Sequence, residues 1–433
     1  MESTVPSLPA QFILAHDSDP DPLRLLLSKG AREEVPDLET AVNTLLCRKK
    51  AKSKLPTWHS HPQIIYPTTL CIEQCSSEAT ASYKAHLARA ILGTGENGKG
   101  TIGCTVADLT GGLGVDSAAF ASIPEVRKVI YNEMNPVLSN AARRNFAVLG
   151  LGDKVQVHSV EITDATSMDD ILGEEVPDLI FLDPGRRSDE GKKVFLLSDC
   201  HPDVTSLAGP LLQRCHHILL KISPMADISM VCSQLPNVRE VHCVQSGGEC
   251  KEVLLHLERE CSGEGHDLIA AVLSPASEPF LWRFHSTCPK SPDIKLPSRE
   301  EGIPEGAMLF EPGKALSKCG VFARLCEEFS LIKLGTNTHL YLTTPLSPTS
   351  TLSRLGKVRP IVESLPLSKA SMKTLSRKYP GAEVSAKNIP LTSEQLSSKL
   401  ATKNAAPKGA FHIYGAGIQW KEGNDEKYLI VTL

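Results

Sequence analysis

The sequence predicts an α/β protein built around a doubly wound, mostly parallel sheet. Three observations lead to this fold class. Strand-like and helix-like runs alternate from residue 101 to about 258, several strands end in an acid, and a glycine-rich turn follows the first strand. A mostly helical pattern precedes this part and a smaller α+β pattern follows it. We therefore expect three regions, at residues 1–93, 101–309 and 310–433.

Apolar residues in the first region recur at the spacing of amphipathic helices. Two groups show it: Leu23, Leu26 and Leu27, and then Leu38, Val42, Leu45 and Leu46. Ser76 or Ser77 is placed to cap a further helix that runs to Ile91. The glycine-rich segment 93–100 then predicts a loop and a boundary between regions.

Seven strands are expected in the central region: Thr105–Leu109, Lys128–Asn132, Lys154–Val160, Asp178–Leu182, His217–Ile222, Val238–Val244 and Glu252–Glu258. Amphipathic helices such as 135–149 separate the first several, which favours parallel pairing. Only residues 245–251 join the last two strands. That connection is too short for a crossover helix, so these two strands should pair antiparallel.

The chain becomes rich in Pro and Ser from about residue 259 to 309, where a few short strands are expected. The third region has a mixed pattern, with helices at Gly313–Phe329 and Lys369–Tyr379, and strands at His339–Thr343, Glu383–Lys387, Gly409–Tyr414 and Tyr428–Leu433. From Phe310 onward there are 17 Lys and Arg against 9 Asp and Glu, whereas the whole chain carries a net charge of −4. A basic region on an acidic body suggests a polyanion partner such as RNA, or only a solvated surface.

Composition restricts the class of protein. Of the 433 residues, 41% are hydrophobic and 22% charged, as in globular proteins. No run of about 18 apolar residues predicts a transmembrane helix, and the N-terminus lacks the pattern of a signal peptide. Thirteen scattered cysteines, without the spacing of a zinc site or a disulfide framework, fit a reducing compartment. We therefore expect a cytoplasmic protein with neither a metal nor a membrane partner.

The glycine-rich turn predicts a ligand pocket. Asp108 ends the first strand, Gly111, Gly112 and Gly114 follow, and a helix begins near Val115. Glycine lets a ligand approach the backbone closely, and a helix start offers free N–H groups. Such a turn builds a nucleotide-type pocket at the carboxyl edge of a parallel sheet. The pattern is neither G-x-G-x-x-G nor a P-loop.

Acids at the ends of successive strands indicate the kind of ligand. Asp108, Glu133, Glu161 and Asp183 close the first four strands, which places four carboxylates along one sheet edge. An acid after the second strand can accept hydrogen bonds from both hydroxyls of a ribose. Carboxylates beside the turn suit a cation rather than a pyrophosphate. These features favour S-adenosylmethionine, which carries an ammonium and a sulfonium.

At this point the chain resembles the class I S-adenosylmethionine-dependent methyltransferases, in the motifs 108–116, 132–135 and 183–184. It is also similar to the methyltransferases with a C-terminal THUMP-like domain, in the segments 72–84, 183–187, 311–314, 337–341 and 387–390. THUMP domains of other enzymes bind structured RNA, usually tRNA. The resemblance therefore implies methylation of RNA, either tRNA or rRNA.

The resemblance also implies roles for single residues. The methionine end of S-adenosylmethionine would lie against Asp108, Thr110, Gly111, Gly112 and Gly114. Glu133 would bind the ribose, Glu161 or else Asp164 would lie near the adenine, and Asp183 would face the methyl group and its acceptor. Pro184, Arg186 and Arg187 would contact the substrate.

One departure from the family limits this interpretation. Enzymes that methylate exocyclic base nitrogens carry an aromatic residue after Asn/Asp-Pro-Pro, which stacks on the flipped base. Here Gly185, Arg186 and Arg187 follow Pro184. The two arginines either contact a phosphate or base or form ion pairs that fix the loop. Methylation of a small molecule or protein, and a non-catalytic RNA-binding role, therefore remain alternatives.

Several single residues keep simpler interpretations. Asp108 can serve only as a helix cap, and Glu133 and Glu161 can be surface acids at strand ends. Lys221, at the end of the fifth strand, either approaches the substrate or merely ends the strand.

Overall fold

The computed structural model describes residues 10–93, 103–164, 167–186, 197–261, 265–275, 277–286, 294–304, 306–345, 350–400 and 411–433, without the side chains of Ser167 and Arg186. The chain divides into two compact units. The first comprises Met1–Ser246, Lys251–Asp267 and Leu273–Pro279, and the second comprises Gly247–Cys250, Leu268–Val272 and Phe280–Leu433.

The N-terminal part of the first unit is helical, as predicted. Its helices are α1 (Ala10–His16), α2 (Lys29–Glu34), α3 (Leu38–Lys54), α4 (Pro56–His59), α5 (Thr69–Gln74) and α6 (Glu78–Leu92). Ser77 caps α6, since its side chain accepts a hydrogen bond from the Thr80 N–H. The segment Pro22–Leu27 is instead a 3₁₀ helix, and Leu23 and Leu27 remain 53% and 89% exposed.

A small apolar core holds these helices together, with Phe12, Ile13, Val42 and Leu45 among its members. The same region is tied to the sheet domain by Asn145. Its side chain accepts a hydrogen bond from the Ile65 N–H at 2.8 Å and donates one to the Ile65 carbonyl at 2.9 Å.

The central part alternates strands and helices. Its helices are α7 (Val115–Ala121), α8 (Pro136–Val148), α9 (Ser167–Leu172), α10 (Val204–Arg214) and α11 (Ile228–Gln234). Its main strands are β1 (Cys104–Asp108), β2 (Val126–Asn132), β3 (Val155–His158), β4 (Leu179–Leu182), β7 (His217–Ile222), β8 (Val238–Ser246), β9 (Glu249–Glu258), β10 (Asp267–Ser274) and β11 (Ser277–His285). Two short strands, β5 (Gly185–Arg186) and β6 (Cys200–His201), pair with each other.

The large sheet has the order β11-β10-β8-β9-β7-β4-β1-β2-β3. Strands β3, β2, β1, β4 and β7 pair in parallel, and β9 runs antiparallel to β7. The predicted doubly wound sheet with an antiparallel last strand is therefore confirmed. Gly247 and Gly248 both have positive φ, +59° and +81°, so β8 and β9 are joined by the tight turn that a β-hairpin favours.

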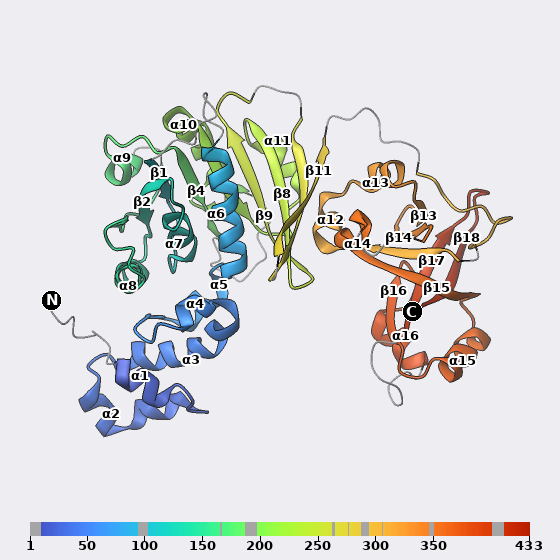
Figure 1. The fold of residues 1–433 in the computed structure, drawn as a ribbon, viewed down its shortest axis with the longest axis horizontal. Helices are drawn as coiled ribbons and strands as arrows, with labels where there is room; N and C mark the ends of the chain where they lie inside the picture. Colours follow the sequence, from blue (N-terminus) through green and yellow to red (C-terminus); the bar gives the residue numbers. More distant parts are fainter. Residues whose placement is uncertain are drawn as a thin grey trace. The chain divides into compact units, whose positions relative to one another are not determined.

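The parallel strands form the centre of the unit. Every residue of β1 and β4 is buried, as expected for strands covered on both faces. Helices α6 and α7 pack side by side, and α7 also contacts β1 and β2 (Figure 1). Because the strands run in parallel, the residues that follow β1, β2, β4 and β7 meet at one edge of the sheet.

The second unit contains a seven-stranded sheet of order β13-β14-β12-β15-β18-β17-β16. Its strands are β12 (Met308–Pro312), β13 (Ile332–Gly335), β14 (Thr338–Thr343), β15 (Gly356–Pro366), β16 (Glu383–Lys387), β17 (His412–Gln419) and β18 (Asp425–Thr432). Its helices are α12 (Lys314–Cys319), α13 (Phe322–Glu328), α14 (Thr351–Leu355), α15 (Lys369–Lys378) and α16 (Ser393–Leu400). The α+β character predicted for this region is confirmed.

Two details of this unit differ from expectation. The single helix predicted at 313–329 is broken at Gly320, which takes a left-handed conformation with φ of +71° and ends α12. The strand predicted at 409–414 is β17, which runs to Gln419, while residues 409–410 lie outside the described ranges.

Candidate functional site

A cavity of about 790 Å³ lies at the carboxyl ends of the parallel strands. The segment between α5 and α6, the glycine turn and the ends of β2, β4 and β7 form its walls. Its lining includes Cys71, Gln74, Cys75, Ser76, Thr110, Gly111, Gly112, Asp116, Glu133, Met134, Val160, Ile162, Asp183, Pro184, Gly185, His201 and Lys221. The predicted pocket is thus present as a hollow in the structure.

The glycine turn is packed tightly against its surroundings. A Cβ atom on Gly111 would lie 2.1 Å from the Tyr131 ring, and one on Gly114, with φ of +91°, would lie 2.6 Å from the Phe146 ring. The Tyr131 hydroxyl also donates a hydrogen bond to the Gly112 carbonyl at 2.5 Å. Glycine is therefore needed at both positions, and the turn is held in one shape beside the cavity.

Asp108 is buried beneath the glycine turn, outside the cavity lining. Its carboxylate accepts hydrogen bonds from the Thr110 N–H at 3.2 Å and the Ser117 hydroxyl at 2.5 Å. Burial raises the pKa of Asp108 to about 7, although the bond from Ser117 opposes this change. Thr110 does line the cavity, and its hydroxyl accepts a hydrogen bond from the Asp183 N–H at 2.6 Å, which joins the loops after β1 and β4.

Glu133 lines the cavity directly after β2. Its two carboxylate oxygens accept hydrogen bonds from the Gly112 N–H at 2.9 Å and the Asn135 N–H at 2.8 Å.

Glu161 differs, because β3 ends at His158 and the Glu161 side chain is 59% exposed, with its carboxylate 3.5 Å from His201 Nε2. Its neighbours Val160 and Ile162 line the cavity instead.

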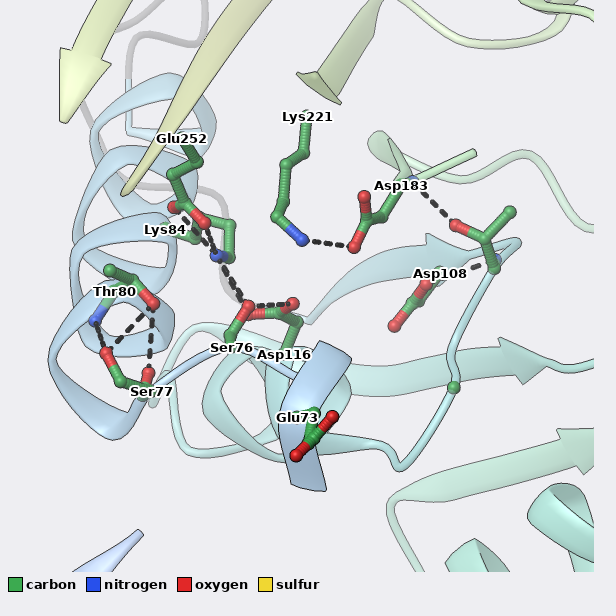
Figure 2. Close-up of polar contacts among 12 residues, drawn as sticks. Glu73, Ser76, Ser77, Thr80, Lys84, Asp108, Asp116, Asp183, Lys221 and Glu252 are labelled. Carbon is green, nitrogen blue, oxygen red and sulfur yellow. Dashed lines mark hydrogen bonds and ion pairs between the residues drawn. The ribbon is translucent and has the colours of Figure 1, made fainter. Parts of the chain in front are cut away.

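Asp183 and Pro184 also line the cavity, after β4. The Asp183 carboxylate forms an ion pair with the Lys221 ammonium, which comes from the next strand, β7 (Figure 2). Burial alone would lower the pKa of Lys221, but the carboxylates of Asp183, Glu252 and Asp116 outweigh it and raise that pKa. Arg186 contributes its backbone to β5, and Arg187 lies outside the described residues.

A buried ionic network lies next to this pair (Figure 2). Lys84, on α6, has no exposed side-chain surface, and its ammonium lies 2.8 and 3.0 Å from the two Glu252 oxygens. It also donates to the Ser76 hydroxyl at 2.9 Å and lies 3.2 Å from Asp116 Oδ1, while Ser76 donates to Asp116 Oδ2 at 2.7 Å. The network joins α6, β9 and the first turn of α7, and two of its members, Ser76 and Asp116, line the cavity.

Lys84 and Glu252 were not among the site residues predicted from the sequence. A signal was present for Lys84, because it lies four residues after Thr80 and three before Leu87, on the buried face of α6. A charged residue at such a position is rarely buried without a partner. No comparable signal identified Glu252 as that partner, since 168 positions separate the two.

Comparison with known proteins agrees with this architecture. The model of a ferredoxin-like domain family matches residues 308–348. No curated protein matches the chain. Among solved structures, a "putative methyltransferase" from Porphyromonas gingivalis W83 shares 28% identity, covers 98% of this chain and 96% of its own, and gives a TM-score of 0.78.

Two human structures are more distant. The N-terminal domain of human METTL16 in complex with SAH has 15% identity, covers 56% of this chain and 95% of its own, and gives a TM-score of 0.36. The human methyltransferase 10 domain containing protein has 13% identity, coverages of 52% and 99%, and a TM-score of 0.34. The assignment rests on the Porphyromonas gingivalis protein, whose similarity shows that this chain has an α/β methyltransferase fold.

Within the described residues, no helix has the length and apolar character needed to cross a membrane. The same residues contain no cluster of three or more His, Cys, Asp or Glu side chains suited to a metal ion.

Proposed function

We propose that this protein is an S-adenosylmethionine-dependent methyltransferase that acts on RNA. The observation that carries the proposal is the cavity itself, in which a tight glycine turn, Glu133 and Asp183 meet at the carboxyl ends of parallel strands. This is the edge at which open α/β sheets bind ligands. The similar protein from Porphyromonas gingivalis, a "putative methyltransferase", supports the methyltransferase part of this proposal.

The cofactor would extend along the glycine turn. Its methionine end lies against Thr110, Gly111 and Gly112, with Asp108 supporting the turn from below. Glu133 accepts hydrogen bonds from the ribose hydroxyls, exchanging them for its present bonds to backbone N–H groups. The adenine lies towards Val160 and Ile162, with Glu161 at the rim.

The methyl group would face Asp183. In-line transfer needs the acceptor atom, the methyl carbon and the sulfur to be aligned, and holding them so supplies much of the rate. Pro184, Arg186 and Arg187 follow Asp183 in the sequence, and we assign them contacts with the substrate. Because the sulfonium loses its charge during transfer, carboxylates that bind it too tightly would slow the reaction.

RNA is the substrate class that the basic C-terminal unit favours. Lys369, Lys373 and Arg377 are exposed on α15 at intervals of four residues, so they lie on one face of the helix. A row of cations spaced in this way suits a phosphate backbone. We assign this unit a THUMP-like, RNA-binding role. None of the twelve described cysteines forms a disulfide, which fits a reducing cytoplasm.

Calorimetric titration of the full chain with S-adenosylmethionine tests the cofactor assignment. We expect saturable binding by the parent protein and at least tenfold weaker binding by Glu133→Gln. Glu175→Gln is a matched control, because Glu175 pairs with Lys128 and does not line the cavity. A folded parent protein that does not bind the cofactor would contradict the enzymatic proposal.

A transfer assay with methyl-labelled cofactor on separate tRNA, rRNA, protein and small-molecule fractions tests the substrate class. We expect label in tRNA or rRNA. Label only in protein or small molecules would replace the RNA proposal with one of those substrates. RNA binding without any transfer, in a protein that also fails to bind the cofactor, would indicate a non-catalytic RNA-binding protein.

A further inference from the structure

The acceptor side of the cavity carries a lysine–aspartate pair. Strands β4 and β7 pair in parallel with Leu182 opposite Leu220, so Asp183 and Lys221 occupy matching positions at the sheet edge. Both side chains line the cavity, and they point towards each other in Figure 2. A bound substrate atom near Asp183 therefore also meets an ammonium group.

Within the described residues, the lining of the same part of the cavity has one aromatic side chain, the imidazole of His201. Among the lining residues in the described ranges there is no Phe, Tyr or Trp, and Pro184 and Gly185 follow Asp183 directly. Base methylation of exocyclic amines commonly relies on an aromatic side chain beside the flipped base. The described lining therefore offers an imidazole, and no larger aromatic ring, for stacking on a base in that way.

The charge of Lys221 discriminates between acceptor atoms. A nitrogen acceptor gains positive charge when it attacks the methyl group, and a neighbouring ammonium opposes that change. A hydroxyl oxygen instead develops negative charge as its proton leaves, and an ammonium that donates a hydrogen bond stabilises it. The carboxylates around Lys221 keep it protonated, since they raise its pKa despite burial.

We propose that the cavity methylates a hydroxyl oxygen, which in RNA is the ribose 2′-hydroxyl, and that Lys221 and Asp183 are its catalytic pair. This inference rests on the proposed function and names its acceptor. The hydroxyl oxygen forms a bond to the methyl carbon as the carbon–sulfur bond breaks. The bonding electrons go to sulfur, which becomes a neutral thioether, and the hydroxyl proton passes to Asp183.

The buried network interacts electrostatically with this pair. Glu252 binds Lys84 directly and also interacts electrostatically with Lys221, so it connects the network with the catalytic pair. Lys84 in turn holds Ser76, which lines the cavity. Lys84 and Glu252 are thus positioning residues: they fix the cavity wall and the charge around Lys221, whereas only Lys221 and Asp183 meet the acceptor.

The chemical identity of the product tests this inference without any variant. RNA methylated by the full chain with labelled cofactor is hydrolysed in alkali, which cleaves only next to a free 2′-hydroxyl. We expect the label in alkali-resistant dinucleotides, and after enzymatic digestion in 2′-O-methylribonucleosides. Label recovered in a methylated base would overturn the hydroxyl proposal and leave the RNA methyltransferase proposal intact. Absence of label from every RNA fraction would overturn both.

Variants then test the assigned pair. We expect Lys221→Met and Asp183→Asn to lower kcat by at least a hundredfold, while S-adenosylmethionine binding changes less than about threefold. Lys128→Met is the matched control, because Lys128 also pairs with a carboxylate, Glu175 at 2.9 Å, but does not line the cavity. A Lys221→Met protein that binds the cofactor and methylates RNA at the parental rate would overturn the role of Lys221.

Discussion

Replacement of Lys84 by methionine should destabilise the first unit strongly, because it removes a buried ammonium and leaves its partners in place. Glu252 would lose two charge-assisted hydrogen bonds of 2.8 and 3.0 Å, and Asp116 would lose an ion pair of 3.2 Å. The side chains of Lys84 and Glu252 are 0% and 3% exposed, so water does not replace these contacts.

The size of the effect follows from this burial. Exposed ion pairs contribute about 0–1 kcal/mol, whereas removal of one partner of a buried pair costs about 3–5 kcal/mol. We therefore expect Lys84→Met to lower the free energy of unfolding at pH 7 by roughly 3–5 kcal/mol. The methionine side chain fills most of the space that Lys84 occupies. The loss of stability therefore comes mainly from the carboxylates of Glu252 and Asp116, which stay buried without their cation.

The loss of stability in Lys84→Met should also depend on pH. Burial raises the pKa of Glu252 in the folded protein, and Lys84 and Lys221 oppose this. Without Lys84 the pKa rises further above that of the unfolded chain. Between these two values the folded state binds the extra proton, so its stability falls as the pH rises. The loss in Lys84→Met should therefore shrink as the pH is lowered from 7 to 5, by about 1.4 kcal/mol per pH unit at most.

Urea unfolding of the full chain measures this, followed by the fluorescence of Trp58 with the other two tryptophans, Trp282 and Trp420, replaced by Phe. Trp58 is buried in the first unit, so its signal reports that unit. Adding Glu252→Gln to Lys84→Met should recover stability at pH 7, since a neutral amide replaces the stranded carboxylate. A loss below about 1 kcal/mol at pH 7, with no recovery and no pH dependence, would refute the reasoning.

Three further predictions concern other parts of the molecule. Gly111→Ala should weaken S-adenosylmethionine binding at least tenfold by displacing the Tyr131 ring, whereas Gly209→Ala, a helical position with open space, should leave calorimetric binding unchanged. In the parent protein, Asp108 should make the folded state less stable as the pH rises from 4 to 7, because its folded pKa of about 7 lies above the ordinary 3.8. Asp108→Asn should remove this decrease, which urea unfolding at pH 5 and pH 7 checks. Replacing Lys369, Lys373 and Arg377 on α15 by glutamine should reduce the salt dependence of RNA affinity. In filter binding, the slope of log affinity against log salt concentration should become shallower by about two to three units.

The cavity could be predicted well from the sequence because parallel strands impose a simple rule. Residues that follow such strands meet at one edge, so the strand pattern alone was enough to place Glu133 and Asp183 together. Glu161 shows the limit of this rule. The strand before it ends three residues earlier, at His158, and the intervening segment turns its side chain to the surface.

The strand pattern could not predict contacts between segments that are far apart in the sequence. Lys84 and Glu252 come from a helix and an antiparallel strand whose packing depends on the whole fold. The C-terminal unit offers a parallel case: Lys387 binds Glu311 at 2.7 Å, and Asn388 donates to Thr338 at 3.2 Å. Motif segments that are separate in the chain thus meet in space, although their spacing alone did not predict these pairs.

The structure also changes the electrostatic argument for the cofactor. Acids at the strand ends suggested a strongly anionic pocket, yet Lys221 pairs with Asp183, Lys84 pairs with Glu252 and Asp116, and burial raises the pKa of Asp108 to about 7. Glu133 is then the main cavity-lining carboxylate without a cationic partner among the described ion pairs, and the role that we propose for it is to bind hydroxyls. Such a pocket should hardly distinguish the sulfonium of S-adenosylmethionine from the neutral sulfur of S-adenosylhomocysteine. We expect their dissociation constants to agree within about fivefold, or 1 kcal/mol, in calorimetry. A preference of a hundredfold for S-adenosylmethionine would show that the acids act on the sulfonium directly.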